Sequence, residues 1–234
     1  MQPIVSIDDL ATVARRLEPL REKCVFTGGA IIGLLLDHPG LVSVRPTKDV
    51  DVIAEVRTRI QYADLEERLR RLEFKHDMSE GAPKCRWLVD DIRVDIMPVT
   101  DQTGELSDKW FELAVRTATK ARAGKTEIWV VTAPCLVATK LETFKDRGKG
   151  DFMASHDIED LFAVIDGREA LIEEIAASPA DIRHFIADTI AEFLENARFR
   201  DSLPGHLPPD DASQQRLPIV LRRLQAIAAL ASRQ

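Results

Sequence analysis

The chain has 234 residues, a formal net charge of −7, and hydrophobic and charged fractions of 45% and 30%, values typical of a globular protein with one large domain or two small ones. No apolar run approaches the roughly 20 residues of a membrane-spanning helix, and the acidic start MQPIVSIDDL lacks the features of a signal peptide. Cys24, Cys85 and Cys135 are widely spaced in apolar surroundings and match neither a zinc site nor a disulfide framework. We therefore expect a cytoplasmic protein with no membrane segment and with buried, reduced thiols.

The first elements predicted are a helix and a short strand that ends in two glycines. Residues 6–9 have the features of a helix start, and apolar residues then recur at helical spacing from Leu10 to Leu20. The strand, residues 24–26, is followed by Gly28 and Gly29 and by an apolar helical run, Ala30–Leu36. Backbone without side chains lets a phosphate approach closely, and the start of a helix favours an anion.

Two acids separated by one valine follow in the next predicted strand, Asp49–Ile53. Because successive strand side chains alternate between faces, Asp49 and Asp51 point the same way. Two neighbouring carboxylates repel each other unless a cation or a proton lies between them, and a divalent ion that prefers oxygen ligands suits this position. Such a pair alone is common on solvated strands, and a Gly-Gly pair is usually only a turn, but the two together are a rarer combination.

The glycines do not form either of the two best-known phosphate-binding loops. Gly28 and Gly33 have the glycine spacing of a Walker loop, but Leu34 and Leu35 stand where Lys and Ser or Thr are required. A Rossmann G-x-G-x-x-G pattern is missing as well.

A predicted hairpin supplies a third acid. After an amphipathic helix at Tyr62–Leu72, two apolar segments in Lys84–Pro98 flank a turn at Asp90-Asp91. Asp95 lies in the middle of the second strand, on the face opposite to its neighbours Val94 and Ile96. On this segment alone an acid on a solvated face is an equally good interpretation, but a two-metal site needs a third carboxylate.

The remainder of the chain is predicted to be mainly helical. Asp101–Gly124 is polar with one helix near Trp110–Arg116, and Thr126–Val131 is predicted to be a strand. Further helices are expected at Pro134–Asp146, Ser155–Ile165, Arg168–Ala176, Pro179–Phe199 and Pro218–Ala231. The prediction is an α+β protein: an α/β domain with a mixed sheet over residues 1–133, followed by an all-α bundle over residues 134–234.

Charged residues near the start of the helical region form a second candidate cluster. Lys140 and Arg147 are two turns apart on one helix face, and Asp157 and Asp160 lie a turn apart on the next helix. They are interpreted either as a surface charge and an N-cap or as a phosphate-binding group. Residues 109–149 also hold nine basic against four acidic residues, an excess that suits either a polyphosphate or RNA contact or an ordinary solvated face.

With Gly28-Gly29, Asp49-x-Asp51 and Asp95 in this order, the chain resembles the DNA polymerase beta-like nucleotidyltransferase superfamily. Within it, Thr47-x-Asp49-Val50-Asp51 and the block from Lys140 to Leu161 look like the AbiEii-type toxins of toxin–antitoxin systems, which include MenT-like toxins. The resemblance covers roughly residues 25–165. One departure is that nineteen residues separate Gly29 from Asp49, more than is usual in the superfamily, so the loop Asp37–Thr47 must absorb the excess.

The resemblance implies a metal-dependent transfer of a nucleoside monophosphate from an NTP to an acceptor hydroxyl. Two Mg²⁺ ions, or Mn²⁺, would be held by the catalytic acids Asp49, Asp51 and Asp95. The resemblance assigns nucleotide binding to a larger set: Thr27, Gly28, Gly29, Lys48, Lys140, Arg147, Asp157 and Asp160. Replacing Lys140 or Arg147 is expected to weaken triphosphate binding and to change stability little.

Three functions remain open from the sequence. The first is a toxin that modifies the acceptor stem of a tRNA and has a cognate antitoxin; the second is a transferase acting on a small molecule such as an antibiotic. The third is a nucleotide-binding relative without activity, against which the three intact acids argue. The RNA hypothesis predicts a basic groove leading to the acids, lined by Arg116, Lys120, Arg122 and Lys145, because phosphate contacts dominate nucleic-acid affinity. A compact pocket lined by Trp and Phe would suit a small acceptor better.

Overall fold

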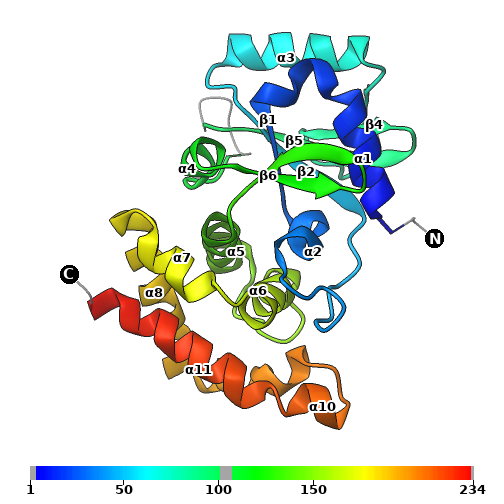
Figure 1. Ribbon diagram of the computed structural model, residues 1–234. Helices are drawn as coiled ribbons and strands as arrows, with labels where there is room; N and C mark the ends of the chain where they lie inside the picture. The colour runs from blue at the N-terminus through cyan, green and yellow to red at the C-terminus, as the bar shows by residue number, and fades with distance from the viewer. Residues whose placement is uncertain (1–3, 101–106, 233–234) are drawn as a thin grey trace. The chain divides into compact units, whose positions relative to one another are not determined.

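The computed structural model describes residues 4–100 and 107–232, and it divides into two compact units (Figure 1). The sheet unit is formed by Met1–Leu34 and Pro46–Thr132, and the helical unit by Leu35–Arg45 and Ala133–Gln234. A seven-stranded mixed sheet combined with many helices confirms the predicted α+β class. None of the helices in the described ranges combines the length and apolarity needed to cross a membrane.

The sheet unit is built on strands that run in both directions. The strands are β1 (Cys24–Thr27), β2 (Asp49–Ala54), β3 (Lys75–His76), β4 (Arg86–Val89), β5 (Ile92–Pro98), β6 (Thr119–Ala123) and β7 (Thr126–Val130). Their order is β3-β4-β5-β2-β1-β7-β6. The pairs β2–β5 and β1–β7 are parallel and the other four are antiparallel.

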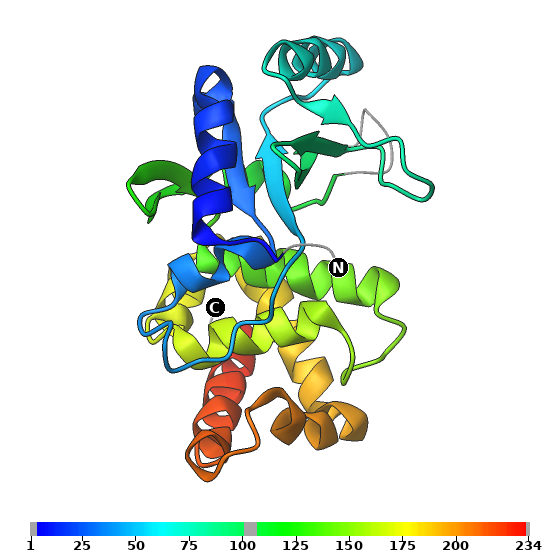
Figure 2. The ribbon, with the colours of Figure 1, turned by 90° about the vertical axis from the view of Figure 1, so that its right-hand side faces the viewer.

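One face of the sheet is apolar and covered by helices. Val50 and Val52 of β2 and Val94 and Ile96 of β5 are fully buried, as strand alternation requires. The helix α1 (Ile7–Arg16) contacts β5, β6 and β7 and can be followed beside the strands in Figure 2.

The start of α1 shows why the chain becomes helical there. The Ser6 hydroxyl accepts a hydrogen bond from the Asp9 amide (3.1 Å), and the Asp9 carboxylate accepts one from the Ser6 amide (2.8 Å). This capping box satisfies two of the amides that a helix start leaves unpaired. A second capped helix, α3 (Arg59–Arg71), buries Leu65 and Leu69, so the predicted amphipathic helix is confirmed.

The predicted hairpin is confirmed, whereas the polar region after it contains one strand that was not predicted. Asp90 and Asp91 both have positive φ, 47° and 63°, as a tight turn between β4 and β5 requires. The predicted helix near Trp110 is α4 (Phe111–Arg116). Strand β6 was not predicted, because it forms the sheet edge and its exposed Thr119 and Lys120 give it a polar sequence.

The helical unit confirms the predicted helices with one break. Its helices are α5 (Ala133–Arg147), α6 (His156–Gly167), α7 (Leu171–Ala177), α8 (Ala180–Glu195), α9 (Ala197–Ser202), α10 (Asp211–Gln214) and α11 (Leu217–Ala228). The run predicted over Pro179–Phe199 is interrupted at Asn196, whose extended backbone ends α8 and whose side chain caps α9. The core of the helical unit contains four phenylalanines whose contacting rings have centroids 4.9–5.5 Å apart: Phe144, Phe152, Phe193 and Phe199.

The long connection between Gly29 and Asp49 belongs largely to the helical unit. Over residues 35–45, hereafter the 35–45 segment, the Asp37 amide donates to the Gly167 carbonyl (3.0 Å), and the Asp37 carboxylate accepts from the Glu169 amide (2.6 Å). A Cβ on Gly167 would lie 2.8 Å from the side chain of Leu36. The extra residues of the connection are thus packed against α6 and the turn that follows it.

Candidate active site

The sheet unit brings the three predicted acids onto one face. Asp51 of β2 lies between Thr27 on β1 and Asp95 on β5, because both are its register partners. Asp49 is two residues before Asp51 on the same strand and therefore shares its face. The acid row, meaning Asp49, Asp51 and Asp95, is consequently a product of strand alternation and of one parallel register.

Gly28 is held against the acid row in a conformation that suits only glycine. Its φ is +73°, and a Cβ at this position would lie 1.9 Å from Oδ2 of Asp51. The adjacent Thr27 is buried, with 5% of its surface exposed. The bare backbone at Gly28 therefore lies directly beside a carboxylate, which accounts for this glycine physically.

Two other expectations about this region need correction or remain predictions. The helix expected over Ala30–Leu36 begins as a 3-10 turn, Gly29–Ile31, and continues only as the short α2 (Ile32–Leu35). A helix of this length supplies little macrodipole. Lys48 is exposed to solvent, and its role in nucleotide binding stays a prediction.

Arg86 of β4 contacts the acid row and was not among the site residues predicted from the sequence. Its Nε donates to Oδ1 of Asp95 (2.7 Å), and its Nη2 donates to Oδ2 of Asp95 (2.7 Å) and to Oδ2 of Asp49 (2.9 Å). Hydrogen bonding to Asp95 raises the pKa of Arg86 further above its already high value, so the guanidinium is a permanent positive charge. The sequence does contain a signal for it: Arg86 and Asp95 are equally far from the Asp90-Asp91 turn, so they are opposite each other in the hairpin.

The acid row fits a divalent metal by the chemistry of its donors. Carboxylate oxygens are the ligands that Mg²⁺ and Mn²⁺ prefer, and Asp49, Asp51 and Asp95 would hold such an ion. As arranged here, no three acidic, histidine or cysteine side chains among the described residues surround a common metal position. The guanidinium of Arg86, shared by Asp49 and Asp95, gives a physical reason.

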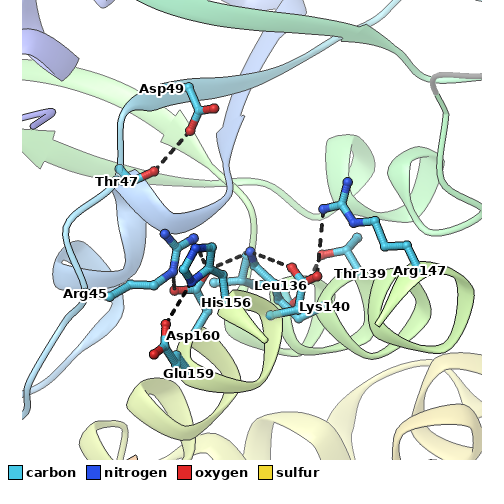
Figure 3. Close-up of polar contacts among 11 residues, drawn as sticks. Arg45, Thr47, Asp49, Leu136, Thr139, Lys140, Arg147, His156, Glu159 and Asp160 are labelled. Carbon is cyan, nitrogen blue, oxygen red and sulfur yellow. Dashed lines mark hydrogen bonds and ion pairs between the residues drawn. The ribbon is translucent and has the colours of Figure 1, made fainter. Parts of the chain in front are cut away.

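The helical unit gathers a second group of charges, shown in Figure 3. Lys140 of α5 donates from Nζ to Oδ1 of Asp157 (3.1 Å) and lies 2.6 Å from Oδ2 of Asp160. Arg45 makes a two-pronged contact with Asp160, at 2.8 and 3.0 Å. The side chain of Asp160 is only 1% exposed, whereas that of Arg147 is 75% exposed and 3.7 Å from Asp157.

These contacts correct the interpretation of Asp157 and Asp160 as a surface charge and an N-cap. Both acids are buried inside α6, and the residue that precedes this helix as its N-cap is Ser155. Arg45 was not among the residues predicted from the sequence, and it lies 115 residues before Asp160 in the chain. No local pattern links residues so far apart, so this pair could not be found from the sequence.

The four bases proposed to line an RNA groove have varied surroundings. Lys120 of β6 is 2.7 Å from Glu127 and stacks over Trp129, with Nζ 5.3 Å from the ring centroid. Lys145 of α5 is 2.9 Å from Glu192. Arg116 and Arg122 are exposed on α4 and β6. Two of the four charges are therefore partly neutralised by acids of their own unit.

A cleft of about 430 Å³ opens in the sheet unit beside α4. Trp129 and Val25 line it together with Glu22, Glu55, Arg57 and Arg116. Val25 lies two residues before Thr27 on β1, and so it is on the sheet face that carries the acid row. This places an aromatic wall and several charged groups on the same face as Asp51.

Comparison with known proteins shows a likeness in fold. No family model and no curated protein sequence matches the chain. The structure is similar to that of an antigenic nucleotidyltransferase-like protein from Paracoccidioides brasiliensis, with a TM-score of 0.54 and 18% identity, covering 96% of this chain and 95% of that chain. A weaker similarity is to the antibiotic-resistance factor ANT(2'')-Ia, with a TM-score of 0.45 and 12% identity, covering 80% of this chain and 95% of that chain.

The chain therefore shares its fold with this nucleotidyltransferase-like protein over nearly its whole length, in agreement with the predicted α+β class. This likeness concerns the arrangement of helices and strands, and the chemistry has to be argued from the acid row itself.

Proposed function

We propose that this protein is a metal-dependent nucleotidyltransferase that moves a nucleoside monophosphate from an NTP to an acceptor hydroxyl. The observation that carries the proposal is the acid row on one sheet face, with Gly28 packed against Asp51. A chain that had kept only the fold would have no need to hold three like charges together, because such a cluster costs stability. We also propose that residues 1–133 act as the catalytic domain and 134–234 as a helical domain.

The reaction assigned to the site is an in-line displacement at phosphorus. The acceptor oxygen forms a bond to the α-phosphorus, the bond from that phosphorus to the pyrophosphate oxygen breaks, and pyrophosphate leaves with the electron pair. Asp95 receives the proton of the acceptor hydroxyl, and the Gly28 backbone leaves room for the triphosphate. Magnesium ions bound at Asp49, Asp51 and Asp95 would neutralise phosphate charge and make the hydroxyl easier to deprotonate.

The assignment of nucleotide binding to Lys140, Arg147, Asp157 and Asp160 remains a proposal that rests on the resemblance. What supports it in the helical unit is the exposed guanidinium of Arg147, which is available to an anion. Lys140 is already paired with Asp157 and Asp160, so we propose that it mainly organises this group.

The test of the activity is transfer of label from each nucleoside triphosphate. The protein is incubated with Mg²⁺ or Mn²⁺, each α-labelled NTP, and either total RNA or a panel of hydroxyl-bearing small molecules. Wild-type protein should label an acceptor, and Asp49→Ala with Asp51→Ala should abolish both the labelling and the binding of Mg²⁺ measured by calorimetry. Labelling at the wild-type rate by the double variant would refute the acid row as the catalytic centre.

The first candidate for the acceptor is the acceptor stem of a tRNA, which would make the protein the toxin of a toxin–antitoxin system with a cognate antitoxin. Its support is the AbiEii-like block from Lys140 to Leu161, together with two basic residues of β6, Lys120 and Arg122. Two residues apart on one strand, these bases share a face. Reversing the charges of Arg116, Lys120 and Arg122 together should abolish RNA labelling and leave nucleotide binding intact.

A small-molecule acceptor is the second candidate, and the cleft lined by Trp129 favours it. The cleft lies on the face of the acid row and is of the size that encloses small ligands. Glu22, Glu55 and Glu112 in its lining would suit an acceptor that carries amines. Trp129→Ala should then reduce labelling of a small acceptor at least tenfold.

A further inference from the structure

We propose that Arg86 supplies one of the positive charges that the acid row requires, so that the free protein binds a single divalent cation there instead of two. This inference deepens the proposed function and rests on it. Two divalent ions are what the resemblance implies for the three acids. Arg86 is a residue of this chain that competes for the same carboxylates.

The hydrogen bonds of Arg86 are made to carboxylate oxygens that would also serve as ligands for a second cation. Both carboxylate oxygens of Asp95 accept from its guanidinium at 2.7 Å. At Asp49, Oδ2 accepts from Arg86 at 2.9 Å and Oδ1 accepts from the Thr47 hydroxyl at 3.0 Å. Both oxygens of Asp95 are therefore in contact with Arg86, and a cation bound there competes with the guanidinium for this carboxylate.

The charges of these side chains also favour one bound divalent cation instead of two. Asp49, Asp51 and Asp95 carry three negative charges, and the guanidinium hydrogen-bonded to two of them leaves a net charge of −2 on these four side chains, which a single divalent cation neutralises. Arginine cannot lose its proton in a protein, so this charge is removed only when the side chain moves. The side chains of Arg86 and Asp95 are 16% and 11% exposed, so solvent screens their attraction only in part.

The neighbours of Arg86 hold its backbone and leave only its side chain to move. Trp87, the next residue, is fully buried, and the carbonyl of Cys85 accepts a hydrogen bond from the Ile96 amide at 2.9 Å. A triphosphate would offer the guanidinium a competing partner, since arginine binds phosphate by the same two-pronged geometry as carboxylate. Arg86 thus ties the second cation to the arrival of the nucleotide.

The contact of Arg86 with Asp49 distinguishes this role from an ordinary cross-strand pair. Arg86 lies opposite Asp95 in the hairpin, and that pairing alone would make a structural ion pair. Its Nη2 is shared with a carboxylate of β2, beyond β5 in the sheet. The guanidinium therefore contacts two members of the acid row at once, and those two carboxylates would also hold a divalent cation.

The experiment measures binding of Mn²⁺ alone to the full-length protein, by calorimetry and by the electron paramagnetic resonance signal of free Mn²⁺. Wild type should bind one equivalent at the acid row, identified as the equivalent that Asp49→Ala with Asp51→Ala removes. Arg86→Gln should bind a second equivalent or bind the first at least tenfold more tightly. Arg86→Lys, which keeps the charge without the fork, should lie between the two.

A matched control is Arg93→Gln. Arg93 of β5 is the register partner of Asp49 and lies on the face of the acid row. Like Arg86→Gln, the substitution Arg93→Gln removes one positive charge. If Mn²⁺ binding responds only to net charge, Arg93→Gln will mimic Arg86→Gln and the inference is overturned. Circular dichroism of each variant establishes folding, and Arg86→Lys carries the test should Arg86→Gln not fold.

Other outcomes also decide the matter. Two equivalents at the acid row of wild type, none at all, or an Arg86→Gln protein that binds like wild type would each overturn the inference. None of these results would touch the proposed function, whose readout is transfer of the NTP label. Wild-type protein that labels no acceptor but binds one Mn²⁺, together with additional or tighter Mn²⁺ binding by Arg86→Gln, would instead refute the function and leave the metal count standing.

Discussion

At the scale of single residues, Gly28 and Arg86 show two ways in which a carboxylate cluster can be accommodated. At Gly28 the chain leaves out a side chain, because a Cβ would overlap Oδ2 of Asp51. At Arg86 it adds a cation that holds Asp49 and Asp95. The first was predicted from the Gly-Gly pair. The second was not predicted, because the contact of Arg86 with Asp49 joins two strands that are distant in the sequence.

Replacing Gly28 by alanine should therefore damage both stability and metal binding. The positive φ and the overlap with Asp51 together should lower the free energy of unfolding by roughly 2 kcal/mol or more, and Mn²⁺ affinity should fall. Gly33→Ala is the control: it lies in α2, a Cβ there meets nothing within 4 Å, and alanine should stabilise by up to about 1 kcal/mol. Urea denaturation of both variants checks the difference, and equal effects would contradict it.

In the charged group of the helical unit, Lys140→Ala and Arg147→Ala should have different effects on stability. Lys140→Ala leaves Asp160, 1% exposed, with one cation fewer, and should lower the free energy of unfolding by about 2–3 kcal/mol. Arg147→Ala removes a side chain that is 75% exposed and should change it by less than about 0.5 kcal/mol. The sequence expectation of little change is thus kept for Arg147 and revised for Lys140. Thermal unfolding of both variants tests this expectation. Similar melting temperatures would show that the ion pairs of Lys140 with Asp157 and Asp160 do not stabilise the fold.

At the scale of elements, the hairpin β4–β5 illustrates what the sequence could and could not reveal. Alternating apolar residues around Asp90-Asp91 predicted both strands, and the turn then determined that Arg86 and Asp95 are opposite each other. The parallel register that brings Asp51 beside Asp95 depends on β2 and β5, which are far apart in sequence. Only a known superfamily pattern, and no local propensity, could suggest that pairing.

The turn itself offers a stabilising substitution. Asp91 has a φ of 63°, which is unfavourable for a residue with a side chain, and Asp-Gly is a favoured pair for such a turn. Asp91→Gly should raise the free energy of unfolding by about 0.5–1 kcal/mol. Asp90→Gly relieves the same backbone conformation but loses the ion pair of Asp90 with Arg16, at 2.8 Å, and should gain less. Denaturant midpoints that rank the two variants in the opposite order would refute this account.

At the scale of the whole molecule, a half-buried histidine makes stability depend on pH. The His206 ring stacks on Phe162 with centroids 4.5 Å apart, and its Nε2 lies 2.7 Å from the Phe152 carbonyl oxygen. Burial lowers the pKa of His206 below its ordinary 6.5. The unfolded chain therefore takes up a proton at this residue before the folded protein does, so stability is lost as the pH falls below about 6.5.

His206→Gln should remove this part of the pH dependence. The free energy of unfolding, measured by urea denaturation from pH 7.5 down to pH 5, should fall less steeply for the variant than for wild type. His156→Gln is the control, because His156 is exposed and its ring meets Glu159 at 3.0 Å. A slope for His206→Gln equal to that of wild type would mean that His206 is protonated as readily in the folded protein as in the unfolded chain.

The 35–45 segment has a consequence for the order in which the protein can fold during synthesis. Arg45 leaves the ribosome 115 residues ahead of Asp160, and Asp37 long precedes Gly167 and Glu169. The helical unit thus begins with a stretch of chain whose binding surface has not yet been translated. The strands β1 and β2 can pair meanwhile, leaving the segment as a loop between them, and the closure of that loop on α6 is a late event that translation speed can influence.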